Sequence, residues 1–247
     1  MKKTCQQCNH TFTVYPEDTD WYKRFEIPAP DLCPACRSQR RLAHRNETSL
    51  YPDQCDLCKK SIISQYHPDS QLTVYCRECW WSDKWNPLDY AQEYNPHQPF
   101  FEQWGKFIRT IPQMNLIDMN SENSAYTNCV SHNKNSYLIF TADYNENSLY
   151  SNWLQHSRDC CDNLKLNNSE RAYECFFGDR LHSSQYLIKC FSATECLYCY
   201  DCRNIQNCFL SSNLRNKQYY ILNKSYSREE YEKIVAEWQL DPPAGRD

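Results

Sequence analysis

The sequence predicts a mainly β protein whose C-terminal half is a parallel β-helix, a solenoid of short stacked strands. The first observation behind this prediction is a repeat of about 12 residues, which occurs nine times between Asn123 and about Lys224. A fixed period of this kind is typical of solenoids, in which each unit buries its apolar face only against its neighbours. The second observation is that polar groups such as SHNK and YNEN separate the copies, and such groups are typical of turns between strands.

The third residue of each copy is apolar or aromatic, and period-2 spacing on a strand points this column, and the residue two places on, toward the core. The third residues expected to point inward include Tyr137, Leu149, Tyr173, Leu197 and Phe209. Asp in place of Leu197 is then expected to prevent folding, whereas Asp in place of Asn133 is expected to be tolerated.

The length of one turn follows from comparing the copies. Successive copies begin at a constant interval except around Ser184. There, one interval is longer by a single residue and the next is shorter by one. This alignment places Tyr173 and Tyr186 in the same column. Alternate copies resemble each other more than adjacent ones do, which favours a 24-residue turn made of two halves. With only three glycines in the chain, asparagine is expected at the corners, because it tolerates the left-handed backbone better than other non-glycine residues.

Length and composition limit the class of protein. The 247 residues allow two or three structural units. No apolar run approaches the about 18 residues of a membrane span, and the N-terminus, MKKTCQQC, reaches cysteine before any apolar signal segment. These features predict a cytoplasmic protein with no membrane partner. The formal net charge of −4 gives no general attraction to nucleic acid.

The first eight of the 17 cysteines form four CxxC pairs. In a reducing compartment such pairs are metal ligands, with disulfides, buried thiols or thioredoxin-like redox use as the alternatives. The second quartet has 17 residues between its pairs, which matches a four-thiolate zinc ribbon, and the first has 24, a longer arm. We expect two structural Zn²⁺ ions, each held by turns on neighbouring hairpins in a closed tetrahedral shell. The predicted ligands are Cys5, Cys8, Cys33 and Cys36 for one ion, and Cys55, Cys58, Cys76 and Cys79 for the other.

The segment between the predicted ribbons, CRSQRRLAHRNE, carries the densest positive cluster of the chain. Its basic residues are Arg37, Arg40, Arg41, His44 and Arg45. On a helix, all of them except Arg40 share one face, and this face could contact the phosphates of a nucleic acid. A solvated helix that offsets the charge of the thiolates is the favoured alternative.

Helical segments are predicted on both sides of the repeats. Asn86 followed by proline predicts the start of a short helix. An apolar stripe predicts a second helix over residues 99–111. A capping box of Ser227 and Glu230 predicts a third, over residues 227–239, that caps the last β-turn.

Three tryptophans follow the last predicted zinc ligand, namely Trp80, Trp81 and Trp85. They are expected to pack the second ribbon against the solenoid. The alternative is an exposed recognition patch, which would be a liability on a monomer.

The repeats contain other residues that could carry chemistry. Four cysteines spaced CxxCxxCxxxxxC resemble an iron–sulfur run, namely Cys196, Cys199, Cys202 and Cys208. Core packing is favoured, because Cys196 and Cys208 lie one repeat apart and Cys199 is expected to face away from Cys196 and Cys202. His132 and His156 occupy the same place in alternate copies, which favours a stacked pair at a turn over a metal site.

Acidic residues in the repeats could line a sugar-binding groove, as on carbohydrate-active β-helices. They are Asp143, Asp162, Glu174 and Asp179. No close pair stands out among them, so solvated turns are the favoured explanation.

Five long motifs resemble those of a known family. They are LCPACRSQRRLAHRNE, CDLCKKSIIS, YCRECWWSDKWNPLDY, QPFFEQW and NLRNKQYYILNKSYSREEY. With these motifs the chain resembles, over nearly its full length, a family of uncharacterised zinc-ribbon proteins of environmental bacteria. The family looks richer in cysteine in the repeats, where this chain has Ser136, Ser148 and Gln185 at the position of Cys160, Cys196 and Cys208. The resemblance supports the architecture and implies no reaction, because the family has no assigned one.

These expectations describe two zinc ribbons (residues 1–46 and 47–82), a helical connector (83–119), a parallel β-helix (120–226) and an amphipathic helix with a tail (227–247). The predicted metal sites are closed, the repeats form a solenoid, and the sequence shows no group of residues typical of nucleophilic catalysis. These features favour a non-catalytic zinc-binding scaffold for a protein partner over an enzyme. One alternative is an RNA- or ribosome-associated zinc-ribbon protein that uses the Arg37–Arg45 face. The other is a carbohydrate-active β-helix enzyme, which needs carboxylates converging on one groove.

Overall fold

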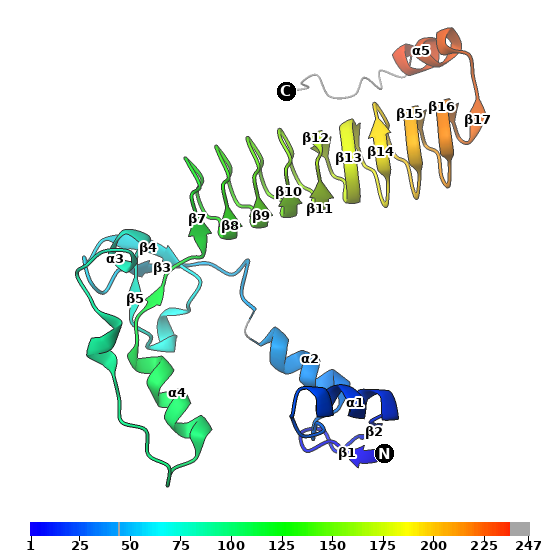
Figure 1. The fold of residues 1–247 in the computed structure, drawn as a ribbon. Helices are drawn as coiled ribbons and strands as arrows, with labels where there is room; N and C mark the ends of the chain where they lie inside the picture. Colours follow the sequence, from blue (N-terminus) through cyan, green and yellow to red (C-terminus); the bar gives the residue numbers. More distant parts are fainter. Residues whose placement is uncertain (44, 238–247) are drawn as a thin grey trace. The chain divides into compact units, whose positions relative to one another are not determined.

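The computed structural model describes residues 1–43 and 45–237 of the chain. The chain divides into two compact units, Met1–Asn46 and Glu47–Asp247. The fold is mainly β, with a C-terminal solenoid and a helix after it (Figure 1). Two cysteine clusters lie near the N-terminus, as the sequence predicts.

The first unit is a small module with little apolar core. Its elements are the antiparallel strands β1 (Lys2–Thr4) and β2 (Thr11–Thr13), followed by α1 (Pro16–Arg24) and α2 (Pro34–Leu42). Proline begins both helices, where its missing N–H costs no hydrogen bond. The buried cluster of this unit consists of Cys5, Cys33 and Cys36, with Phe12 and Leu32 packed against it.

The second unit begins with a similar hairpin and a series of short elements. They are β3 (Tyr51–Gln54), β4 (Ser61–Ser64), η1 (Pro68–Ser70), β5 (Val74–Tyr75), α3 (Arg77–Trp80), η2 (Pro87–Tyr90), α4 (Phe100–Thr110) and β6 (Gln113–Met114). The N-cap predicted at Asn86 is confirmed, because its side chain accepts the N–H of Leu88 at 3.0 Å. Strand β5 pairs in parallel with β6 and so ties the region of the second cysteine cluster to the segment just before the solenoid.

Two of the three clustered tryptophans pack against the second cysteine cluster. The ring centroids of Trp80 and Trp85 lie 4.9 Å apart, and the indole N–H of Trp85 donates to the carbonyl of Trp80 at 3.0 Å. Tyr75 packs edge-on against Trp85, next to the buried cysteines. Trp81 is 69% exposed. The expectation that all three pack the second predicted ribbon against the solenoid is therefore wrong, because Trp80 and Trp85 complete the small core around the second cysteine cluster.

The solenoid has about nine turns over residues 118–221. Its strands stack in chain order and in parallel (Figure 1), except that β12 pairs only with β13 and β17 returns antiparallel to β16. The strands are β7 (Asp118–Met119), β8 (Asn128–Ser131), β9 (Phe140–Asp143), β10 (Asn152–Gln155), β11 (Leu164–Asn167), β12 (Glu170–Tyr173), β13 (Phe176–Gln185), β14 (Phe191–Thr194), β15 (Arg203–Phe209), β16 (Arg215–Ile221) and β17 (Lys224–Ser225).

One turn corresponds to a single copy of the repeat, and the predicted 24-residue turn is wrong. Strand register couples residues 12 apart along the whole solenoid, as Asn152 pairs with Leu164. The register is also uniform around Ser184, because Tyr173 pairs with Gln185 and Gln185 with Leu197. The unequal intervals inferred there are therefore wrong as well.

Alternate copies resemble each other because stacked neighbours complement rather than repeat one another. His132, Tyr144 and His156 stack ring on ring, with centroids 4.5 and 5.1 Å apart. Along another column Lys134, Glu146, Arg158 and Glu170 alternate in charge, and Arg158 Nη2 lies 2.8 Å from Glu170 Oε1. Such pairs stabilise neighbouring strands. The likeness of alternate copies thus reflects side-chain pairing on the outside of the turns.

Side chains point into the solenoid at every third residue, not at every second. From Thr127 to Ser211 each third residue is buried, and the residue before it has a positive φ, as at Tyr126 (54°). A left-handed residue at every third place bends the chain, so that each turn has four short sides. Asparagine fills many of these places as expected, but Leu138 and Trp153 fill others, at a steric cost of about 1–2 kcal/mol for each such residue.

The predicted core column lies on the outside. Tyr137 and Leu149 are each 37% exposed, and Tyr173 is only half-buried. Leu197 and Phe209 are buried, but against the C-terminal helix rather than inside the coil. The expectation failed because period-2 alternation belongs to an extended strand, whereas this chain turns at every third residue.

Serine and cysteine have the same role inside the coil. Ser148 Oγ donates to the carbonyl of Glu146 at 3.1 Å, and Cys160 Sγ donates to the carbonyl of Arg158 at 3.3 Å. Each side chain thus bonds the backbone two residues before it. Buried polar groups with such partners do not destabilise a core, which explains why this interior accepts both residue types.

Helix α5 (Arg228–Glu237) covers one side of the last turns. Its capping box is confirmed, because the N–H of Glu230 donates to Ser227 Oγ at 3.2 Å and the N–H of Ser227 donates to Glu230 Oε2 at 2.8 Å. Tyr231 of α5 packs in one cluster with Leu197, Phe209 and Ile221, which belong to three different turns. The helix therefore packs beside the stack of turns rather than only over its end. Residues 238 and 239 of the predicted helix lie outside the described residues.

Candidate metal centres

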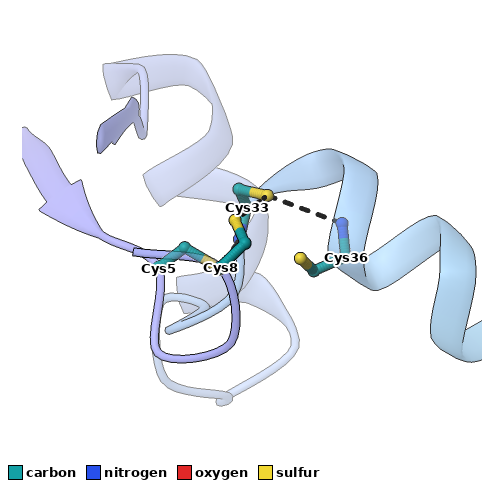
Figure 2. Close-up of side chains that lie close together, drawn as sticks. All are labelled: Cys5, Cys8, Cys33 and Cys36. Carbon is teal, nitrogen blue, oxygen red and sulfur yellow. Dashed lines mark hydrogen bonds between the residues drawn. The ribbon is translucent and has the colours of Figure 1, made fainter. Parts of the chain in front are cut away.

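The first cysteine quartet lies between the β1–β2 hairpin and the start of α2. Cys5 and Cys8 lie in the hairpin turn, Cys33 is the N-cap residue of α2, and Cys36 lies in its first turn. Figure 2 shows the four side chains gathered at this helix end. Their Sγ atoms lie within 4.8 Å of one another, and those of Cys8 and Cys33 are 3.7 Å apart.

The second quartet repeats this arrangement between the β3–β4 hairpin and α3. The Sγ atoms of Cys58 and Cys76 are 3.8 Å apart. The N–H of Cys76 donates to Cys55 Sγ at 3.2 Å, as the N–H of Cys33 donates to Cys5 Sγ at 3.2 Å in the first quartet. The two clusters are therefore two copies of one local design.

A left-handed residue closes each CxxC turn. Asn9, directly after Cys8, has a φ of 57°, and Lys59, directly after Cys58, has a φ of 61°. The N–H of each returns to the carbonyl of the first cysteine, over 3.0 Å to Cys5 and 2.8 Å to Cys55. This tight turn points two thiols to the same side.

The second pair of each quartet begins a helix, whereas a second hairpin was expected from the sequence. Cys33 and Cys76 are the N-cap residues of α2 and α3. Free backbone N–H groups and the partial positive charge at a helix N-terminus stabilise thiolates. The sequence did contain an indication that α2 begins here, because Pro34 follows Cys33 and proline favours the first position of a helix.

Burial and backbone N–H groups act on these thiols in opposite directions. Burial, with help from the neighbouring thiols, raises the pKa of Cys36 to about 12. Burial also opposes ionisation of Cys5, but backbone N–H groups, first that of Cys33, outweigh it and lower the pKa of Cys5 to about 6. The pKa of Cys55 is lowered to about 6 in the same way. Four thiolates this close together need a cation between them.

The sulfur separations fit a tetrahedral metal site. With metal–sulfur bonds of about 2.3 Å, the sulfur atoms of a tetrahedral four-thiolate site lie about 3.8 Å apart. The observed Sγ–Sγ distances of 3.7 and 3.8 Å agree with this value. All eight predicted ligands thus belong to two groups that could hold a metal ion.

The predicted basic face is divided in the structure. Arg37 is half-buried, and its guanidinium donates to the hydroxyl of Tyr22 at 2.9 Å. Arg40, Arg41 and Arg45 are exposed, while His44 lies outside the described residues. Arg37 therefore holds α2 against α1, and less positive charge reaches the surface than predicted.

The cysteines of the CxxCxxC run all point into the solenoid. Cys196, Cys199 and Cys202 are buried, so the expectation that Cys199 faces away from the other two is wrong. Cys199 Sγ donates to the carbonyls of Leu197 at 3.4 Å and Cys208 at 3.5 Å. Within residues 1–43 and 45–237, only the two N-terminal quartets bring three or more metal-ligand atoms within 4.8 Å. Packing therefore accounts for these thiols.

The histidines and carboxylates of the repeats are separated. Tyr144 lies between His132 and His156, so the two imidazoles do not stack directly on each other. Asp143 accepts a hydrogen bond from Ser131, and Asp179 pairs with Arg180 at 3.0 Å. The other two carboxylates, Asp162 and Glu174, lie on a different side of the turn. The four do not converge on one groove.

Comparison with known proteins adds no family: no family model matches the chain, and no curated protein matches it. The two candidate metal sites therefore rest on cysteine spacing and geometry alone. In the part of the chain that the structure describes, no helix is long and apolar enough to span a membrane.

Proposed function

We propose that both quartets bind zinc and that the chain is a non-catalytic, zinc-stabilised scaffold for a protein partner. Ligand chemistry supports zinc, because tetrahedral four-sulfur sites select zinc or iron, and closed four-cysteine shells are those of structural zinc. Four thiolates complete the coordination of each ion. The zinc ions thus hold the hairpins and helices together and leave no position for a substrate.

Elemental analysis tests the metal. Protein purified without added metal is expected to contain two zinc ions per chain, one for each quartet. Cys58→Ser removes one ligand of the second quartet and is expected to lower the content to one. Iron in place of zinc, or a single zinc ion in the native protein, would contradict the proposal.

The partner is supported by what the solenoid places on its surface. Its interior polar side chains form hydrogen bonds with backbone groups of the solenoid. Large aromatic and aliphatic side chains lie on the outer surface in regular columns. Tyr137, Leu149, Tyr150 and Tyr198 are all exposed. Tyrosine is common in the energetically important part of protein interfaces. Stacked strands fix these side chains in advance, which lowers the entropy cost of binding.

Affinity capture on the zinc-loaded full chain is expected to recover a defined protein that survives nuclease treatment. The same protein, purified separately, should bind the chain in a two-component assay. RNA is the competing class, because Arg40 and Arg41 are exposed on α2. Tight, steeply salt-dependent RNA binding that the double variant Arg40→Ser, Arg41→Ser loses would overturn the proposal.

A further inference from the structure

One side of the solenoid, here called the apolar side, is lined by large apolar and aromatic residues. It consists of two neighbouring outward columns in which residues 12 apart stack on each other. The first column runs at every twelfth residue from Tyr137 to Ile221, and the second from Tyr126 to Leu222. Except for Tyr186, which lies in the second column, the first is the column that the sequence pattern assigned to the core.

An amphipathic helix of the chain itself already covers the C-terminal end of this side. Helix α5 uses Tyr231, Ile234 and Val235, which share one helix face by i, i+3 and i+4 spacing. They pack in one cluster with Leu197, Phe209 and Ile221 of three consecutive turns. The apolar side is thus built to accept a helix across its turns.

The N-terminal part of the apolar side has no such cover among the described residues. Exposed fractions there are 44% for Tyr126, 37% for Tyr137, 37% for Leu149 and 52% for Tyr150. Taking roughly 200 Å² for each of these four side chains, the exposed apolar area is on the order of 300 Å². Patches of this size on a monomer are commonly binding sites.

Two carboxylates lie in the middle of this surface. Asp162 and Glu174 occupy consecutive places of the second column, between Tyr150 and Tyr186. Asp162 accepts a hydrogen bond from the thiol of Cys161 at 3.4 Å. Within the described residues, neither carboxylate forms an ion pair. The surface therefore presents negative charge, without a basic partner, between two groups of apolar side chains.

We propose that the uncovered part of the apolar side binds an amphipathic α-helix of the partner, which carries lysine or arginine beside its apolar stripe. The proposal rests on the scaffold function and names its surface. The uncovered part continues the surface on which α5 packs, which supports a helix as its ligand. The two carboxylates require basic residues opposite them. A second copy of the chain fits less well, because two apolar sides face to face bring like charges together.

A designed peptide tests both features. The probe is a fluorescein-labelled amphipathic helix with Leu and Tyr at i, i+3, i+4 and i+7 and two lysines beside this stripe; its twin has glutamate in place of lysine. Fluorescence anisotropy on the zinc-loaded full chain is expected to show micromolar affinity for the lysine peptide and about tenfold weaker binding of the twin. The double variant Asp162→Lys, Glu174→Lys is expected to reverse this preference.

Two matched variants separate this result from unspecific effects. Asp83→Lys with Glu93→Lys makes the same change in net charge at exposed positions outside the solenoid and should leave both affinities unchanged. Tyr137→Ser with Tyr150→Ser removes exposed rings, so the chain should stay folded by circular dichroism and lose both peptides. Equal affinity for the two peptides, or binding that survives the loss of both rings, would overturn the proposal.

Other occupants give different results. If a chain that ends at Glu237 binds the lysine peptide much more tightly than the full chain, residues 238–247 occupy the surface and the proposal fails. If light scattering shows a dimer that Tyr137→Ser with Tyr150→Ser makes monomeric, the occupant is a second copy. If the captured partner still binds this double variant, the scaffold function stands and this surface is not its site.

Discussion

Replacing Cys5 with serine is expected to unfold the first unit, Met1–Asn46, and to leave the solenoid folded. The buried cluster of this unit consists of three cysteines, with two partly buried apolar side chains against it. A unit of this size with so little core seldom folds without a metal or a crosslink. Zinc binding contributes on the order of 10 kcal/mol to such modules, which is as large as the whole stability of an ordinary domain.

Amide hydrogen exchange followed by mass spectrometry measures this effect by region. Peptides that cover β1, β2 and α2 should lose their protection in the Cys5→Ser protein, and those that cover β8 to β15 should keep it, because the solenoid has its own core cluster. A strong zinc chelator added to the native protein should produce the same loss in the first unit.

Cys160→Ser is the matched control. Cys160 is also buried, but it lies inside the coil and donates to a backbone carbonyl, as Ser148 does one turn earlier in the same column. This substitution should change neither the zinc content nor the protection of the first unit. A first unit that stays protected after Cys5→Ser and after chelation would show that zinc is not what folds it.

Asn133→Asp is expected to destabilise the solenoid strongly, contrary to the tolerance that the sequence suggested. Asn133 is 1% exposed. Its Nδ2 donates to the carbonyl of Ala142 at 2.9 Å, and its Oδ1 accepts the backbone N–H of Asn145 at 2.9 Å. A carboxylate keeps the second bond but sets a negative oxygen against the Ala142 carbonyl. A buried charge with no cation beside it costs about 3–5 kcal/mol.

The loss should depend on pH with a definite sign. Burial raises the pKa of the new aspartate in the folded state above the about 3.9 of an unfolded chain. The destabilisation is therefore full at neutral pH and decreases as the pH falls through the raised pKa, because the protonated acid can donate to Ala142 again. Hydrogen exchange of β8 to β10 at pH 7 and pH 5 measures it.

Asn213→Asp is the control for this series, since Asn213 is an exposed left-handed residue of the same solenoid. Asparagine and aspartate both tolerate that conformation, so its protection should match the native protein at each pH. Equal protection of the Asn133→Asp and Asn213→Asp proteins at pH 7 would show that Asn133 does not point inward.

The cysteine quartets, the solenoid and the terminal capping box were accessible to sequence analysis because local chain geometry specifies them. A CxxC turn points two thiols to one side whatever the rest of the chain does, and Ser227 with Glu230 bond each other within one helical turn. A regular repeat of chemically similar segments implies by its period alone that the segments stack.

Sequence patterns therefore identify the eight cysteines that could hold metal, the extent of the repeats and the fact that they stack.

The length of a turn and the columns that face inward depend on the tertiary structure. A regular repeat is compatible with turns of one copy or of two, and complementary pairs such as Arg158 and Glu170 made alternate copies look alike. Because every third residue has a left-handed backbone, every third side chain points inward. The sequence did not reveal these left-handed positions, because bulky residues such as Trp153 occupy them instead of glycine. Tyr137 and Leu149 consequently lie on the surface, because the path of the backbone, and not hydrophobicity, decides which column is enclosed.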